Sequence, residues 1–147
     1  MNKRVVGLLV VALFIVGALL FLWNMQPANR KSGAGVVSSQ LTVEDIAVGS
    51  GNAVKSGDTI VIHYEGKFLT GDVFDSSYTR GKPFETIIGV GRVIKGWDEG
   101  VIGMKKGGKR KLTIPPDKAY GPQGVPGAIP PNATLIFTLE LLEIKSQ

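Results

Sequence analysis

The chain has 147 residues, enough for one ordinary domain and an appendage. It has no cysteine and one histidine, which excludes disulfides, thiolate chemistry and Cys/His zinc sites, so we expect no metal and no cofactor. Four of its 17 Lys and Arg residues precede Leu41, and the other 13 face 12 Asp and Glu, leaving a net charge of only +1 after that point. The basic character comes from the first forty residues, which argues against nucleic acid as the main partner.

A long apolar run opens the chain. The 19 residues Val5–Trp23 carry no charge, and a helix of that length spans about 28 Å, close to the ~30 Å of a membrane's hydrocarbon layer. We therefore expect residues 1–23 to form an uncleaved single-pass transmembrane anchor. Cleavage as a signal peptide, followed by secretion, is the alternative, although such peptides usually have an apolar core of only about 7–15 residues. Lys3 and Arg4 favour a cytoplasmic N-terminus, which would place the C-terminal domain on the extracytoplasmic side.

A linker and one folded domain follow. Residues 24–40 are rich in Gly, Ser, Ala and Asn without an apolar period, which predicts a flexible linker. In the domain, residues 41–147, Val93–Ile102 is the only predicted helix, and Pro115–Asn132 is a long loop of the kind that is often functional. The predicted strands are Leu41–Val48, Thr59–Phe68, Val73–Asp75, Pro83–Ile88, Lys109–Ile114 and Ala133–Lys145. This pattern predicts an α+β fold, an antiparallel sheet packed around one short helix.

Isolated aromatic residues, most of them beside turns, suggest a pocket. They are Tyr64, Phe74, Phe84, Tyr120 and Phe137. We interpret them as lining an apolar cup whose floor is Trp97, on the predicted helix, and we expect the cup to bind a proline ring. Asp75 and Tyr120 would place one carboxylate and one phenol at its rim. The alternative, if the pattern alone is considered, is that these aromatic residues form a sealed core without a pocket.

Other motifs favour structural roles. Gly89-Val90-Gly91 does not continue into a phosphate-binding loop, because Ile94 and Trp97 stand where such loops need Gly and Lys. His63 lies on the outward face of its predicted strand and is expected to be solvated. The basic cluster in residues 105–111 is expected to be a solvated sheet edge, with contact to anionic lipid as a minor alternative.

Two polar patterns are also open to interpretation. Asp98 and Glu99 are adjacent on the predicted helix and point to different sides, so they suit the helix dipole better than paired acid–base chemistry. Asn132-Ala133-Thr134 matches an N-glycosylation sequon, which matters only if the host glycosylates exported proteins.

Five short motifs distinguish the folded part. They are Val61–Gly66 (VIHYEG), Phe74–Ser77 (FDSS), Val93–Trp97 (VIKGW), Ala119–Gly121 (AYG) and Ile129–Leu135 (IPPNATL). In their order and spacing they resemble the FKBP-type peptidyl-prolyl cis-trans isomerases, and the resemblance covers residues 41–145. It implies a twisted antiparallel sheet wrapped around one short helix, and isomerase activity without a cofactor.

The resemblance also implies roles for the matching residues. Trp97 would lie under the proline ring, and Asp75 would be the polar group at the rim. The Tyr120 hydroxyl and the Ile94 backbone N–H would donate hydrogen bonds to carbonyls of the bound segment, while Ile129 would shape a flap over the site. We therefore expect catalytic roles for Asp75, Tyr120, Ile94, Trp97, Phe74 and Phe137, and substrate binding by Tyr64, Phe84, Val93 and Ile129.

Three positions differ from the pattern expected of that family. Val125 stands where a histidine is common, Ala128 where a larger aliphatic residue is common, and Arg92 where Glu or Gln is common. We expect all three at the rim of the cup, where they would affect sequence preference and macrolide affinity more than activity.

The predicted function is peptidyl-prolyl cis-trans isomerisation that assists protein folding at or beyond a membrane. The expected partners are proline-containing polypeptides and, through the N-terminal helix, the membrane; macrolide ligands of the family are candidates, and we expect a monomer. A non-catalytic module that holds proline in the same cup is the main alternative. A holdase chaperone is a weaker one, because it would call for an inserted apolar flap near Gly81–Pro83 or Gly89–Gly91, where the connections are short.

Overall fold

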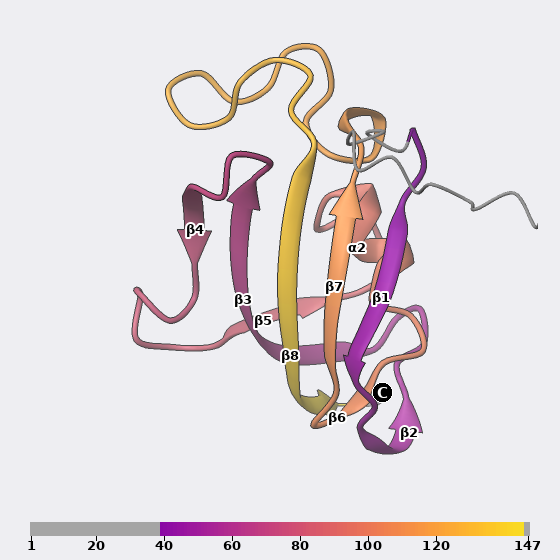
Figure 1. Cartoon of the computed structure of the whole chain (residues 1–147). Coiled ribbons are helices and arrows are strands. Elements are labelled where there is room, and N and C mark those ends of the chain that lie inside the picture. The colour runs from indigo at the N-terminus through magenta and orange to yellow at the C-terminus, as the bar shows by residue number, and fades with distance from the viewer. Residues whose placement is uncertain (1–38, 146–147) are drawn as a thin grey trace, which may run out of the picture. The chain divides into compact units, whose positions relative to one another are not determined.

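The computed structural model describes residues 39–145, which form a curved antiparallel sheet with one short α-helix beside it (Figure 1). The helical elements are α2 (Lys95–Gly100) and the 3-10 turn η1 (Pro116–Lys118). The strands are β1 (Thr42–Ala47), β2 (Ser50–Ala53), β3 (Thr59–Phe68), β4 (Val73–Ser76), β5 (Phe84–Ile87), β6 (Lys105–Lys106), β7 (Lys109–Ile114) and β8 (Leu135–Lys145). The predicted architecture of the domain, a sheet around one short helix, is confirmed.

Strand β3 organises the sheet. The main sheet runs β1-β7-β8-β3-β4, and β5 also pairs with β3, while β2 and β6 form a separate two-stranded sheet. β3 pairs with β8 along its whole length, with β5 over its first half and with β4 over its second half, always antiparallel. One strand therefore brings together side chains from three distant parts of the chain.

Alternating burial along the strands builds the core. β3 and β8 each alternate buried and partly exposed residues over most of their length, as their apolar period predicted. The buried face packs against α2, and glycines in the helix allow the close approach. A Cβ atom on Gly96 would lie 2.4 Å from Cγ2 of Ile114, and one on Gly100 would lie 2.7 Å from Cδ1 of Leu112. The two glycines thus permit the helix to lie directly on β7.

The helix is shorter than the predicted Val93–Ile102. Ile94 has extended backbone angles (φ −58°, ψ 148°), so the helix begins at Lys95, and Gly103 at φ 84° cannot continue it. As a result Val93 and Ile94 precede the helix in irregular backbone. The chain also forms the short strand β2, which is not among the predicted strands, and η1 lies within the expected loop.

The prediction that the basic cluster is a solvated sheet edge is wrong for the residues on β7, because β7 lies between β1 and β8, although most of the cluster is solvated. The lysines are partly or fully exposed, and Lys109 and Lys111 pair with Glu140 and Glu44 across neighbouring strands. Arg110 differs, because the alternation of β7 turns it inward and leaves it only 8% exposed.

Arg110 is buried with its charge fully partnered. Its guanidinium donates to the Asp45 carboxylate (2.6 Å) and to the carbonyls of Gly100 (2.8 Å) and Ile102 (2.9 Å) at the end of α2. The hydrogen bond from Arg110 lowers the pKa of Asp45. Arg110 therefore ties β1 and the end of the helix to β7.

Within residues 39–145, no helix is long and apolar enough to cross a membrane. The predicted anchor, residues 1–23, and the linker up to residue 38 lie outside the described residues.

Candidate active site

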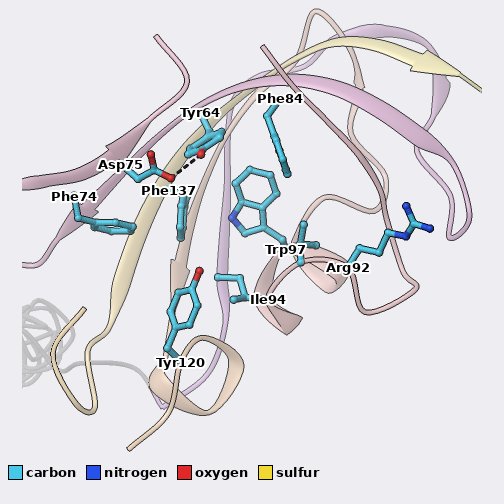
Figure 2. A pocket seen from close by; sticks show the side chains of 10 residues that line it. Tyr64, Phe74, Asp75, Phe84, Arg92, Ile94, Trp97, Tyr120 and Phe137 are labelled. Atoms are coloured by element: carbon cyan, nitrogen blue, oxygen red, sulfur yellow. Dashed lines mark hydrogen bonds between the residues drawn. The ribbon is translucent and has the colours of Figure 1, made fainter. Parts of the chain in front are cut away.

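A cavity of about 210 Å³ opens between α2 and the concave face of the sheet (Figure 2). Its lining residues are Tyr64, Phe74, Asp75, Phe84, Arg92, Val93, Ile94, Trp97, Tyr120 and Phe137. Nine of them are residues that the sequence singled out for the site, and Arg92 is one of the three predicted rim positions. The aromatic residues therefore surround a hollow instead of closing into a sealed core.

Trp97 forms the floor of this cavity. It projects from α2 and is only 4% exposed. Its indole meets Tyr64 and Phe137 edge to face, with ring centroids 5.3 Å and 5.4 Å apart, and Phe84 at 6.2 Å. Such perpendicular contacts fix the orientation of the rings. The floor is consequently rigid before any ligand binds.

The indole Nε1 of Trp97 is buried without a hydrogen-bond partner among residues 39–145. Figure 2 shows this nitrogen on the edge of the indole that points toward Phe137, whose ring is nearly perpendicular at 89°. This donor is therefore buried next to the Phe137 ring without a conventional acceptor among the described residues.

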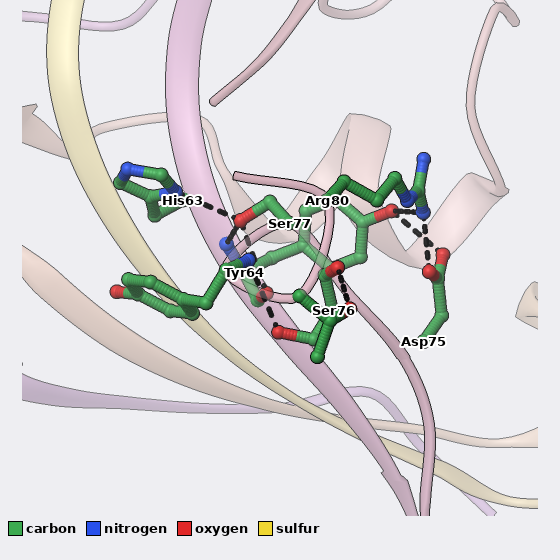
Figure 3. A network of polar contacts seen from close by, with 8 residues as sticks. His63, Tyr64, Asp75, Ser76, Ser77 and Arg80 are labelled. Carbon is green, nitrogen blue, oxygen red and sulfur yellow. Dashed lines mark hydrogen bonds and ion pairs between the residues drawn. The ribbon is translucent and has the colours of Figure 1, made fainter. Parts of the chain in front are cut away.

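A carboxylate with fixed partners lies at the rim. The Tyr64 hydroxyl donates to Asp75 Oδ2 at 2.6 Å, and Arg80 pairs with Asp75 while its guanidinium also contacts the Tyr64 hydroxyl (Figure 3). Burial alone would raise the pKa of Asp75, but the hydrogen bonds from Arg80 and Tyr64 outweigh it and lower that pKa. Burial and the bond to Asp75 raise the pKa of Tyr64 to about 12. At neutral pH the site thus holds a carboxylate and a neutral phenol.

Sequence reasoning missed Arg80. It lies in the exposed polar segment between β4 and β5, where no periodicity marks it. Only the register of β4 on β3, which sets Asp75 opposite Gly66, brings the Asp75 carboxylate within reach of both Tyr64 and Arg80.

Two hydrogen-bond donors at the cavity are available to a ligand. Among the described residues, neither the Ile94 backbone N–H nor the Tyr120 hydroxyl has a hydrogen-bond partner. Ile94 precedes the helix, so its backbone N–H takes no part in the helical hydrogen bonds. Its carbonyl does, and accepts a hydrogen bond from the Trp97 N–H at 2.9 Å. Burial and the nearby Asp75 charge raise the pKa of Tyr120, so its hydroxyl remains protonated at neutral pH. Both groups can therefore donate a hydrogen bond to a carbonyl oxygen of a bound chain.

Asp98 holds the loop that carries Arg92, Val93 and Ile94. Its carboxylate accepts hydrogen bonds from the N–H groups of Gly89 (2.7 Å) and Gly91 (2.8 Å). The predicted role of Asp98 in balancing the helix dipole is therefore incomplete, since both of its oxygens bind the preceding loop. The neighbouring Glu99 points elsewhere and pairs with Lys118 of η1.

Ile129 does not line the cavity. It is 8% exposed, belongs to the hydrophobic core and pairs with Val125, each accepting the other's N–H at 2.8 Å. Val125, Ala128 and Ile129 instead line a separate shallow depression beside Phe68. This segment is a small hairpin; Val125 and Ala128 were expected at the rim of the cup and Ile129 in a flap over it, and none of the three is among the residues that line the cavity.

His63 is not the solvated histidine that the sequence predicted. Its ring stacks on Tyr78 at a centroid distance of 4.4 Å, and Nδ1 lies 2.9 Å from Ser77 Oγ, which also accepts the Tyr64 N–H (Figure 3). The stacked Tyr78 ring covers His63 on the outward face of β3 and leaves it half-buried. His63 therefore supports the strand from behind and does not reach the cavity.

Comparison with known proteins places this geometry in a family. The family model described as FKBP-type peptidyl-prolyl cis-trans isomerase matches residues 50–142. The chain is 58% identical over 105 residues to "FK506-binding protein 1" of Rhizopus delemar, covering 71% of this chain and 97% of that protein. It is 54% identical over 108 residues to "Peptidyl-prolyl cis-trans isomerase" of Schizosaccharomyces pombe, covering 71% and 96%.

A solved structure agrees. The crystal structure of AtFKBP13 superposes with a TM-score of 0.67 and 45% sequence identity, covering 71% of this chain and 93% of that chain. The matched stretch makes up almost the whole of the Rhizopus protein. The chain belongs to the FKBP-type peptidyl-prolyl cis-trans isomerases, and its residues 50–142 match that family's model.

Proposed function

We propose that this protein accelerates rotation about Xaa–Pro bonds within the aromatic cup and assists the folding of polypeptides at or beyond a membrane. The observation that carries the proposal is the combination at the cavity: an apolar floor of fixed rings with two unpartnered donors at its edge. A proline ring would lie on Trp97. The carbonyls on either side of it would accept from Tyr120 and from the Ile94 N–H.

The chemistry requires no nucleophile. Amide resonance opposes the rotation with a barrier of about 20 kcal/mol, and the planar amide is more polar than the twisted transition state. Moving the bond from water into an apolar cup therefore disfavours the planar form relative to the twisted one. A ~10⁵-fold acceleration would need about 7 kcal/mol from desolvation and positioning together.

Asp75 would act through position and charge. Its carboxylate is held by Tyr64 and Arg80 and remains ionised at neutral pH because its pKa is lowered. Fixed in this way, it orients the Tyr64 ring that forms a wall of the cup, while its own negative charge is balanced by the Arg80 guanidinium.

Magnetisation-transfer NMR on a short Leu-Pro peptide tests the catalytic site. The full-length chain in phosphatidylcholine nanodiscs should accelerate exchange between the cis and trans forms. Phe137→Ala should impair turnover by removing a wall, and Asp75→Val should impair it while the fold is retained. Lys106→Ala, which changes an exposed residue of β6 far from the lining residues, is the control. Exchange at the wild-type rate in both site variants would refute these roles.

The membrane part of the proposal comes from composition. The uncharged run Val5–Trp23 has the length and hydropathy of a spanning helix, and Lys3 and Arg4 favour an extracytoplasmic domain. Alkaline carbonate extraction should leave the protein with the membranes, and mass spectrometry should find residues 1–23 still attached. Recovery of a soluble protein that lacks residues 1–23 would instead support secretion after cleavage.

Macrolide binding and a monomeric state complete the proposal. The Rhizopus relative is named for binding FK506, and we expect this cup to bind the same ligand. FK506 should then inhibit the exchange reaction competitively. The expected monomer can be checked by light scattering on a fragment of residues 39–147.

A further inference from the structure

The charges around the cavity do not cancel. Two charged side chains line it, Asp75 and Arg92. Asp75 is already neutralised by Arg80, with which it forms an ion pair. For Arg92, in contrast, no ion pair or side-chain hydrogen bond is formed within residues 39–145. The charge that the lining presents to a ligand is therefore the positive one.

Arg92 is held in a defined place. Its loop is fixed on one side by the Asp98 carboxylate, which binds the N–H groups of Gly89 and Gly91, and on the other side by the start of α2 at Lys95. Gly91, directly before Arg92, has φ 74°, a conformation that glycine adopts without strain. The guanidinium is consequently an exposed group on an anchored backbone.

The direction of the side chain indicates what it could meet. Figure 2 shows Arg92 across Trp97 from Asp75 and Tyr120, with its guanidinium directed away from the aromatic rings. It does not point at the place where a proline ring would lie on Trp97. In this direction it would meet a side chain that flanks the proline in a bound polypeptide, not the proline ring itself.

We propose that Arg92 is a specificity-determining residue, which favours polypeptides with an acidic side chain next to the Xaa–Pro bond and disfavours basic ones. This inference rests on the proposed proline cup and names the class of substrate that it prefers. Because Arg92 is exposed, its attraction is that of a solvent-screened ion pair, and we expect a preference of about two- to tenfold in kcat/KM for Glu over Lys.

The test uses two peptide series, Xaa-Leu-Pro-Phe and Leu-Pro-Xaa-Phe, with Glu, Gln or Lys at Xaa. Exchange is measured by magnetisation transfer at neutral pH with the full-length chain in phosphatidylcholine nanodiscs. In at least one series, kcat/KM should be highest for the Glu peptide, lower for the Gln peptide and lowest for the Lys peptide. The preference should shrink when the salt concentration rises from about 20 mM to about 300 mM.

Variants assign the preference to one side chain. Arg92→Gln should bring the Glu/Lys ratio close to one, and Arg92→Glu should invert it. Lys95→Glu makes a similar change of charge three residues away, outside the lining residues, and should keep the wild-type ratio. Each ratio is taken within one variant, so a general loss of activity or folding cancels.

The outcomes separate two kinds of failure. If the Gln peptides are not turned over, the proposed function fails and this inference fails with it. If the Gln peptides are turned over but Glu and Lys peptides react equally in both series, only the inference fails. The inference is also overturned if the Glu-over-Lys preference survives Arg92→Gln, or if Lys95→Glu changes that preference as strongly as the Arg92 variants do.

Discussion

Gly66 lies behind two walls of the cup, and replacing it with alanine should deform the site. In β3 it stands opposite Phe137 of β8 and Asp75 of β4. A Cβ atom at this position would lie 2.6 Å from Cζ of Phe74 and 2.9 Å from Cε1 of Phe137. Carbon atoms pack favourably at about 3.5–4.0 Å, so each ring would have to move by roughly 0.5–1 Å.

The size of the effect follows from this overlap. Overpacking a well-packed region costs about 1–3 kcal/mol, and we expect Gly66→Ala to lower the free energy of unfolding by that amount. Because both rings line the cavity, their displacement would change the space in which a proline ring would lie. Since a misplacement of about 1 Å can cost 100-fold in rate, we expect kcat/KM to fall by about ten- to hundredfold.

Two measurements on a fragment of residues 39–147 check the prediction: urea unfolding, and magnetisation-transfer exchange of a Leu-Pro peptide. Gly100→Ala is the matched control, because its Cβ would lie 2.7 Å from two methyl carbons of Leu112, which does not line the cavity. It should destabilise the domain comparably and leave turnover close to that of the wild type.

A double-mutant cycle locates the overlap. Phe74→Ala would remove one of the rings that the new methyl group meets, so the cost of Gly66→Ala should be smaller in that background than in the wild type. Unchanged turnover in Gly66→Ala, or an equal loss of turnover in both glycine variants, would contradict the argument that the pocket walls transmit the effect.

Three further predictions concern the cup. Trp97→Phe removes an Nε1 that has no hydrogen-bond partner among the described residues, so it should lower the free energy of unfolding by about 1–2 kcal/mol and retain turnover. Trp97→Ala should lower the free energy of unfolding by about 3–5 kcal/mol and abolish turnover. Unfolding and exchange measurements check the two effects. The lowered pKa of Asp75 means that its stabilisation is present above the ordinary value of 3.8 and is lost as pH falls through the lower pKa of the folded state. Urea titrations below about pH 5 should therefore show a flatter pH dependence for Asp75→Asn than for the wild type. The pKa of Tyr64, raised from 10.0 to about 12, predicts stability that is complete below pH 10 and lost between these two values, and Tyr64→Phe should remove that alkaline loss.

The sequence predicted best what depends on local periodicity. Alternating apolar residues placed Ile60 and Ile62 of β3 and Leu139 and Leu141 of β8 on the buried face, and all four are fully buried. Alternation is a local property of an extended chain, since successive side chains point to opposite faces. The motifs that resemble the FKBP family contain seven of the ten residues around the cavity, because that family's order and spacing recur here, and the pattern of isolated aromatic residues adds Phe84 and Phe137.

The tertiary structure decided which polar groups meet. Arg80 reaches Asp75, Asp98 binds the loop before the helix, and Arg110 is buried against Asp45. Each contact depends on strand register or on where the helix begins, and neither can be read from hydrophobic period. The position of Ile129 could not be read from the hydrophobic period either, because its pairing with Val125 places it in the core.

The amino-acid sequence by itself thus determined the sheet, the position of the short helix and the apolar character of the cup. Whether that cup is open, which donors remain unpartnered and which charge it presents were decided only when segments distant in the chain came together. The physical reason is that burial pattern is carried by neighbours along a strand, while a cavity and its electrostatics are carried by neighbours in space.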